Sequence, residues 1–119
     1  MSLNVEYQPN DICLLRISGI LKRSEFGAAQ AALASHIDSG PKPRLLVVLE
    51  KFEGWERGAD WNDLDFMISH GGKISKIAIV EEARWETLAL AFAGAGVRRA
   101  PVKFFPPNEL EQAQSWLAE

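Results

Sequence analysis

Runs of hydrophobic residues, separated by turn and cap sequences, predict an α/β domain with five strands and four helices. Two short runs joined by Pro9-Asn10-Asp11 predict an antiparallel hairpin, because these residues favour turns. The later runs Leu45 to Leu49 and Ile77 to Val80 are apolar at every position, which is typical of strands buried on both faces of a parallel sheet. The expected strands are 3–7, 12–18, 45–49, 74–81 and 101–105.

Apolar residues at helical spacing predict helices at 24–37, 60–70 and 84–93 and a last helix after Asn108. We expect Ser24 to cap the first helix and Asp60 the second. Short polar side chains at that position accept hydrogen bonds from the free N–H groups of a first helical turn.

The apolar stripe of each predicted helix indicates which side faces the sheet. Phe66 and Leu90 fall off the stripes of their helices and are expected to point away from the core. Core-facing residues are expected in the third helix at Trp85, Leu88, Ala89 and Phe92, and in the last at Leu110, Ala113, Trp116 and Leu117.

The stretch 44–70 organises the predicted fold as a buried strand, a loop at 50–59 and a helix. Both faces of the central strands are apolar, so helices must cover both. Right-handed crossovers between strands laid down in sequential order would place every helix on one face. We therefore expect the strand order to reverse, which would create a crevice at the carboxyl ends of the strands.

The composition is that of one folded domain spanning residues 1–119. Hydrophobic residues make up 47% and charged residues 24%, which is ordinary for a globular protein. A net charge of -3 with scattered basic residues argues against nucleic acid as a partner. The lone Cys13 suits a reducing interior, and neither a signal peptide nor a run of ~20 apolar residues is present. A cytoplasmic location is expected, with no transmembrane segment but with peripheral membrane contact possible.

The sequence contains no motif of a well-known chemistry. His36 and His70 lack the spacing of metal ligands, and the phosphate-binding loop, the dinucleotide fingerprint and the nucleophile elbow are all missing. Four acids at or beyond strand ends could converge as paired carboxylates, although solvated loops look the same. They are Glu50, Glu53, Glu81 and Glu82. We expect no metal and no cofactor, and an enzyme is the least favoured class.

Trp61 and Trp85 follow strand ends, and Trp55 lies in a polar, Gly-flanked loop where a large aromatic side chain has little reason to be exposed. The three rings would either cover the sheet as core or line an apolar pocket or partner surface. Arg57 and Arg84 would edge such a pocket. Phe66 and Leu90 would extend the surface or form a homodimer contact, although simple burial against a neighbouring loop is the commoner outcome for such residues. The candidate ligand- or partner-binding residues are Glu50, Phe52, Trp55, Arg57, Asp60, Trp61, Phe66, Glu81, Arg84 and Trp85.

Six segments of the sequence are similar to those of a known family. They are Phe52 to Trp55, Asp60 to Leu64, Lys76 to Val80 with Trp85, Val102 to Phe105, Glu109 to Ala113 and Trp116-Leu117. With these segments the sequence resembles the SpoIIAA-like family of small stand-alone bacterial domains, and the order of its elements is that of the STAS fold. This resemblance implies a mixed five-stranded sheet with helices packed on it, and roles in regulatory protein binding or in holding apolar ligands near membranes.

One feature of the classical antagonists does not carry over. In those proteins a Ser at the start of the second helix is phosphorylated to switch partner binding. Here Asp60 occupies that position, and residues 50–64 contain neither Ser nor Thr.

Two hypotheses follow from these residues. The first is a non-enzymatic regulatory or protein-interaction module that self-associates and engages a protein partner near residues 50–64. The alternative is a carrier for a small apolar or lipid-like ligand, held between the second and third helices and the sheet. An open apolar cavity would favour the carrier, whereas a filled sheet top would exclude it.

Overall fold

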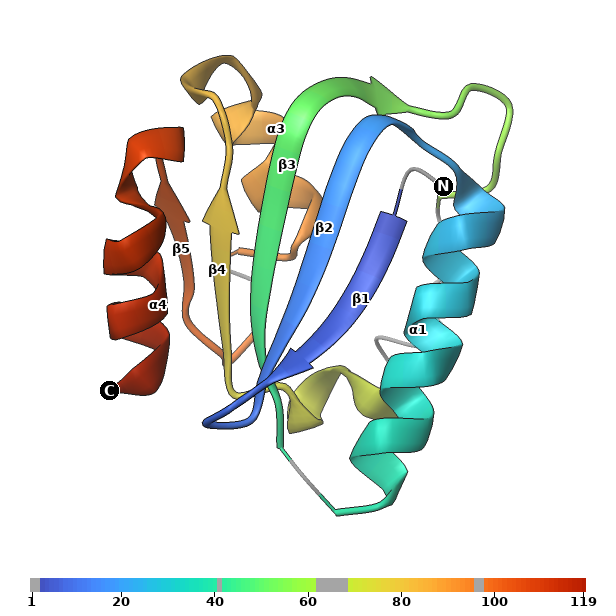
Figure 1. The fold of residues 1–119 in the computed structure, drawn as a ribbon. Helices are drawn as coiled ribbons and strands as arrows, with labels where there is room; N and C mark the ends of the chain where they lie inside the picture. The colour runs from blue at the N-terminus through green and yellow to red at the C-terminus, as the bar shows by residue number, and fades with distance from the viewer. Residues whose placement is uncertain (1–2, 41, 62–68, 96–97) are drawn as a thin grey trace.

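A computed structural model describes residues 3–40, 42–61, 69–95 and 98–119. Its centre is a five-stranded mixed sheet with helices on both faces, which confirms the predicted α/β fold class (Figure 1). The strands are β1 (Leu3–Gln8), β2 (Ile12–Leu21), β3 (Arg44–Trp55), β4 (Lys76–Val80) and β5 (Val102–Phe105).

The first two strands form the predicted hairpin. β1 pairs antiparallel with β2, while β2, β3, β4 and β5 pair in parallel. Asn10 and Asp11 form the turn with φ of 68° and 60°. Asn and Asp tolerate this left-handed conformation better than most residues, so the turn sequence fixes the hairpin.

The helical segments lie between and after the parallel strands. Of the expected helix at 60–70, Ser69 and His70 are helical and Trp61 lies in a turn, whereas residues 62–68, including Phe66, lie outside the described residues. The described segments are α1 (Arg23–Asp38), η1 (Gly71–Lys73), η2 (Ala83–Trp85), α3 (Glu86–Phe92), η3 (Pro107–Glu109) and α4 (Leu110–Ala118).

The expected reversal of strand order is wrong, because the strands lie in the order β1-β2-β3-β4-β5. Helices α1 and α3 cover one face and α4 covers the other (Figure 1). On that second face, Ala113 and Leu117 belong to the same buried cluster as Leu46 and Ala78. A helix after the last strand is not a crossover, so the right-handed rule does not decide which face it covers. Both faces are thus buried without a crevice between diverging strands.

The expected loop at 50–59 is also wrong over its first half. β3 continues to Trp55, which pairs with Leu21 of a similarly extended β2. The register shifts at Ser18–Ile20, and Lys51 and Gly54 have φ of 50° and 108°. Such a bulge disrupts the alternation of side chains, so the sequence pattern hides the strand while its residues still pair.

Two expectations about helices need correction. Ser24 does not cap α1, which begins at Arg23 and has Lys22 at its N-cap without a side-chain hydrogen bond. On α3, Leu88 is 55% exposed and Leu90 packs against the core, the reverse of the expected faces. The short 3₁₀ turn η2 precedes α3 and advances with three residues per turn, which rotates the apolar stripe relative to a continuous α-helix.

Candidate functional site

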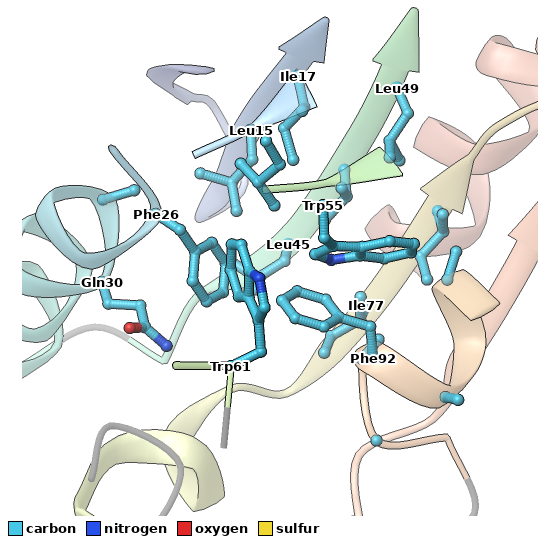
Figure 2. Close-up of a pocket in the computed structure, with 18 of the residues that line it drawn as sticks. Leu15, Ile17, Phe26, Gln30, Leu45, Leu49, Trp55, Trp61, Ile77 and Phe92 are labelled. Atoms are coloured by element: carbon cyan, nitrogen blue, oxygen red, sulfur yellow. The ribbon is translucent and has the colours of Figure 1, made fainter. Parts of the chain in front are cut away.

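A cavity of about 390 Å³ lies between the sheet and helices α1 and α3 (Figure 2). Its volume is within the range of small-molecule sites, roughly 300–1,000 Å³. Its wall is mostly apolar because alternate residues of β2, β3 and β4 point to this face. The described residues that form the apolar wall include Leu15, Ile17, Leu21, Phe26, Ala29, Leu33, Leu45, Val47, Leu49, Ile74, Ile77, Ile79 and Ala89.

Four aromatic rings from distant parts of the chain meet at this cavity: Phe26, Trp55, Trp61 and Phe92, which we call the aromatic cluster (Figure 2). Phe92 on α3 contacts the other three, with ring-centroid distances of 5.2 Å to Phe26, 5.4 Å to Trp55 and 5.7 Å to Trp61. Tilted and edge-on contacts at these distances are favourable for aromatic side chains. The cluster therefore brings together two of the three tryptophans singled out in the sequence.

Trp85 contacts the aromatic cluster but does not belong to it. Its ring lies 5.0 Å from Phe52, which is fully buried, and 6.1 Å from Trp55. Gly54 approaches this indole and has a φ of 108°, a backbone conformation that favours glycine; a Cβ there would be in ordinary contact with the ring at 3.6 Å. Phe52 lines the cavity with Trp55, whereas Trp85 is not among the described lining residues.

Trp61 is held against α1 by the segment after β3. Its indole N–H donates to the carbonyl of Glu56 at 2.9 Å, and the Glu56 carboxylate accepts from the backbone N–H of Arg23 at 3.0 Å. The Arg23 guanidinium lies 5.8 Å from the ring centroids of both Phe26 and Trp61, and its Nε donates to the carbonyl of Asp60. Glu56 thus takes over the capping role expected of Ser24.

Arg98 is a polar lining residue that sequence reasoning missed. Its Nε and Nη1 are buried and have no hydrogen-bond partner among the residues that the structure describes. Burial lowers the pKa of its guanidinium. Arg98 and Arg99 are adjacent basic residues after a Gly-rich stretch, and no signal in the sequence indicates which of the two is buried.

The remaining predicted site residues lie away from the cavity wall. Glu50 is exposed and pairs with Arg16 at 3.5 Å, and Arg57 and Asp60 are exposed. Arg84 is exposed, lies over the ring of Trp85 at 5.3 Å and pairs with Glu82 at 3.6 Å. Within the described residues, the expected cationic edge of the pocket is therefore formed by Arg23 and Arg98 instead of Arg57 and Arg84.

Glu81 is fully buried at the end of β4. Its Oε1 accepts the backbone N–H of Glu82 at 2.8 Å, while Oε2 has no partner in the described part of the chain. Burial raises the pKa of this carboxyl group to about 7. The acids expected to converge instead have different partners. Glu50 and Glu82 form ion pairs with arginines, and Glu81 accepts a backbone hydrogen bond.

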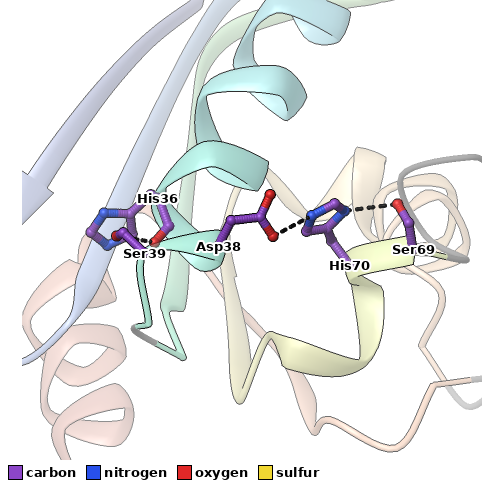
Figure 3. A network of polar contacts seen from close by, with 5 residues as sticks. All are labelled: His36, Asp38, Ser39, Ser69 and His70. Carbon is purple, nitrogen blue, oxygen red and sulfur yellow. Dashed lines mark hydrogen bonds and ion pairs between the residues drawn. The ribbon is translucent and has the colours of Figure 1, made fainter.

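The two histidines lie at or near the C-terminal end of α1 (Figure 3). The carbonyl of His36 accepts from Ser39 Oγ at 2.7 Å, and its ring lies 4.5 Å from that of Tyr7. His70 Nε2 lies 2.9 Å from Asp38 Oδ1, and His70 Nδ1 lies 2.7 Å from Ser69 Oγ. A hydrolytic triad has a buried carboxylate at Nδ1 and a serine at Nε2. Here Asp38 is 62% exposed and the ring nitrogens are used in the opposite order, so the contacts link α1 to the segment before η1.

The described residues give little support to metal or thiol chemistry. None of their His, Cys, Asp and Glu side chains form a group of three or more that could hold a metal ion. Cys13 is free and buried, as expected, and burial raises the pKa of its thiol to about 11. In the same ranges, no helix is both long and apolar enough to span a membrane.

Comparisons with known proteins agree on the fold. A family model described as SpoIIAA-like matches residues 12–118. A search of curated proteins found no match. Among solved structures, the chain is similar to an uncharacterised protein with a SpoIIAA-like fold from Shewanella loihica, with 21% identity, a TM-score of 0.71 and coverage of 97% of this chain and 91% of that one. At this level of identity the similarity shows the shared fold.

Proposed function

The chain belongs to the SpoIIAA-like family, and from this premise we propose that it is a non-enzymatic protein that binds a small apolar or lipid-like ligand. The observation that carries the proposal is the cavity of about 390 Å³ under α1 and α3. We propose the cytoplasm as its location, because its single cysteine is free and buried, which suits a reducing compartment.

The energetics of packing support a bound ligand. Protein interiors are close-packed, and side chains that border empty space lose dispersion contacts on that side. An apolar ligand would restore those contacts and remove its own apolar surface from water at the same time. The other face of the sheet needs no such ligand, because Ala113 and Leu117 of α4 are fully buried against it.

The surface beside the cavity supports uptake of an apolar molecule. Phe92 lines the cavity and is 36% exposed, and Leu88, one helical turn earlier on α3, is 55% exposed. Contiguous exposed apolar side chains mark sites of contact with ligands, membranes or other proteins. Phe92 thus connects the interior of the cavity to the exterior of the protein.

The test uses dodecanol as a neutral alkyl probe and the emission of the cavity tryptophans as the signal. Ala29 lines the cavity on α1, so Ala29→Phe should fill it and abolish binding. Ala32 lies on the exposed side of the same helix, so Ala32→Phe serves as the matched control and should bind like the wild type. Circular dichroism would verify that both variants fold. Failure of the wild type to bind, or equal binding by Ala29→Phe, would contradict the proposal.

A regulatory or protein-interaction module is the second candidate, with the exposed pair Leu88 and Phe92 as the observation that favours it. Native mass spectrometry of gently purified protein separates the two. A retained lipid-sized mass supports the ligand binder, and a dimer mass supports self-association. A bare monomer that also fails to bind dodecanol counts against both.

A further inference from the structure

We propose that the ligand is a long-chain carboxylate whose head group is bound by Arg98, an inference that rests on the proposed function. Arg98 lines the cavity with two of its guanidinium nitrogens, Nε and Nη1, buried. Neither nitrogen has a partner among the residues that the structure describes. A mostly apolar cavity that contains an unpartnered cation is complementary to an amphipathic anion.

An arginine in this state is unusual. Nearly all buried polar groups in proteins form hydrogen bonds, and leaving such a group unpaired is unfavourable. Arg98 is half-buried, and two of its guanidinium nitrogens are buried without a partner among the described residues. Arginine remains protonated in proteins, so it cannot avoid this cost by losing its proton. The lowered pKa of Arg98 is consistent with a site that lacks its counter-charge.

The backbone holds Arg98 at this place. Its N–H donates to the carbonyl of Gly94 at 3.1 Å, and the N–H of Ala95 donates to the carbonyl of Leu90 at 3.0 Å in the turn that ends α3. These two bonds hold the backbone of Arg98 close to the end of α3. Arg99, the next residue, is exposed.

The rest of the lining indicates a single charge on the ligand. Arg23, the other described cationic lining residue, already donates to the carbonyl of Asp60 and lies over two aromatic rings. Trp55 also lines the cavity, and its indole N–H is buried without an acceptor among the described residues. A carboxylate carries one negative charge and several acceptor sites, whereas a phosphate monoester carries about 1.5–2 charges near neutral pH.

The experiment compares dodecanoate with dodecanol, which share the chain and differ in the head group. We expect the wild type to bind dodecanoate at least about tenfold more tightly, since hydrogen bonds to charged groups are stronger than neutral ones. Arg98→Met should weaken dodecanoate binding by about ten- to a hundredfold and dodecanol binding by less than dodecanoate binding, because only the carboxylate loses a charge-assisted hydrogen bond. Arg99→Met is the matched control and should change neither affinity.

The outcomes separate this inference from the proposed function. If neither probe binds, the proposed function fails and this inference fails with it. If both probes bind with equal affinity, the cavity binds ligands but the carboxylate assignment is overturned. The comparison of probes on the wild type needs no variant, so it decides the question even if Arg98→Met does not fold. Tighter binding of dodecyl phosphate than of dodecanoate would also overturn the assignment.

Discussion

Glu81 shows how one buried residue makes the stability of the whole chain depend on pH. Its side chain is fully buried, and only Oε1 has a hydrogen bond among the described residues. Desolvation favours the neutral acid, and the pKa in the folded state rises from 4.5 to about 7. The folded protein therefore binds this proton more tightly than the unfolded chain does.

The sign of the resulting pH dependence follows from linkage. The stabilisation that the protonated Glu81 side chain provides is fully present below the unfolded-state pKa of 4.5 and is lost as the pH rises through about 7. The loss is on the order of 3 kcal/mol across that window, at 1.36 kcal/mol per pKa unit. Urea unfolding at a series of pH values should show this decline in the wild type.

Glu81→Gln should remove most of that decline. Glutamine keeps the carbonyl oxygen that accepts the N–H of Glu82, but it cannot ionise. The variant should therefore be more stable than the wild type above about pH 7 and similar to it below about pH 4.5. Glu111→Gln, on the exposed side of α4, is the control. Parallel pH curves for Glu81→Gln and the wild type would show that another group is responsible.

The segment after β3 connects two elements through Glu56. Its backbone N–H donates to the carbonyl of Leu21 at 2.9 Å, its carbonyl accepts from Trp61, and its carboxylate caps α1 at the N–H of Arg23. The capping bond satisfies one of the free N–H donors of the first turn of α1. The negative charge of the Glu56 carboxylate also interacts favourably with the positive end of the helix dipole.

Glu56→Ala should lower the free energy of unfolding by about 0.5–2 kcal/mol, the usual cost of losing a helix cap. Glu56→Gln keeps an acceptor oxygen and should cost less than Glu56→Ala. Glu53→Ala, at an exposed position of β3, should change stability little. The midpoints of chemical unfolding measure all three. An equal cost for the Gln and Ala variants would mean that the charge, and not the hydrogen bond, provides the stabilisation.

Helix α4 allows stability and ligand binding to be separated. Leu117 is fully buried on the face opposite the cavity. Leu117→Ala should lower the free energy of unfolding by about 2–5 kcal/mol, as large-to-small changes in a core do. Its affinity for dodecanol should equal that of the wild type under conditions where it is folded. Weaker binding would show that the two faces of the sheet are coupled.

The limits of prediction from the sequence also lie at the level of elements. Apolar periodicity located all five strands, the hairpin and the last helix, because side-chain burial is what that periodicity records. The bulge around Gly54 and the 3₁₀ turn before Leu88 shift the period locally, so the length of β3 and the exposed face of α3 could not be predicted. The cavity, and the two Arg98 nitrogens that lack a partner among the described residues, depend on packing between distant segments, which no local pattern contains.

On the scale of the whole molecule, the two faces of the sheet differ: one borders a packed core and the other borders a cavity. Strands β2, β3 and β4 point alternate side chains to each face. On one face, Ala113 and Leu117 of α4 complete a packed core. On the other, α1 and α3 enclose the cavity with the aromatic cluster. Stability can therefore come from the packed face while the other binds a ligand.

This division predicts that a ligand of the cavity stabilises the folded state by mass action. At a free ligand concentration about a hundred times the dissociation constant, binding adds about 2.7 kcal/mol to the free energy of unfolding. For a chain of 119 residues this corresponds to a rise in Tm of roughly 10 °C. Thermal unfolding with and without dodecanoate, followed by circular dichroism, measures the shift.

The matched alanine variants show whether that shift arises from the cavity. Ala29→Phe occupies the cavity and should show no shift, whereas Ala32→Phe should shift like the wild type because its side chain points to solvent. Leu117→Ala should start from a lower Tm and still gain the full increment, since its defect lies on the opposite face. A shift that persists in Ala29→Phe would mean that the alkyl chain binds elsewhere, for example on the exposed Leu88 and Phe92.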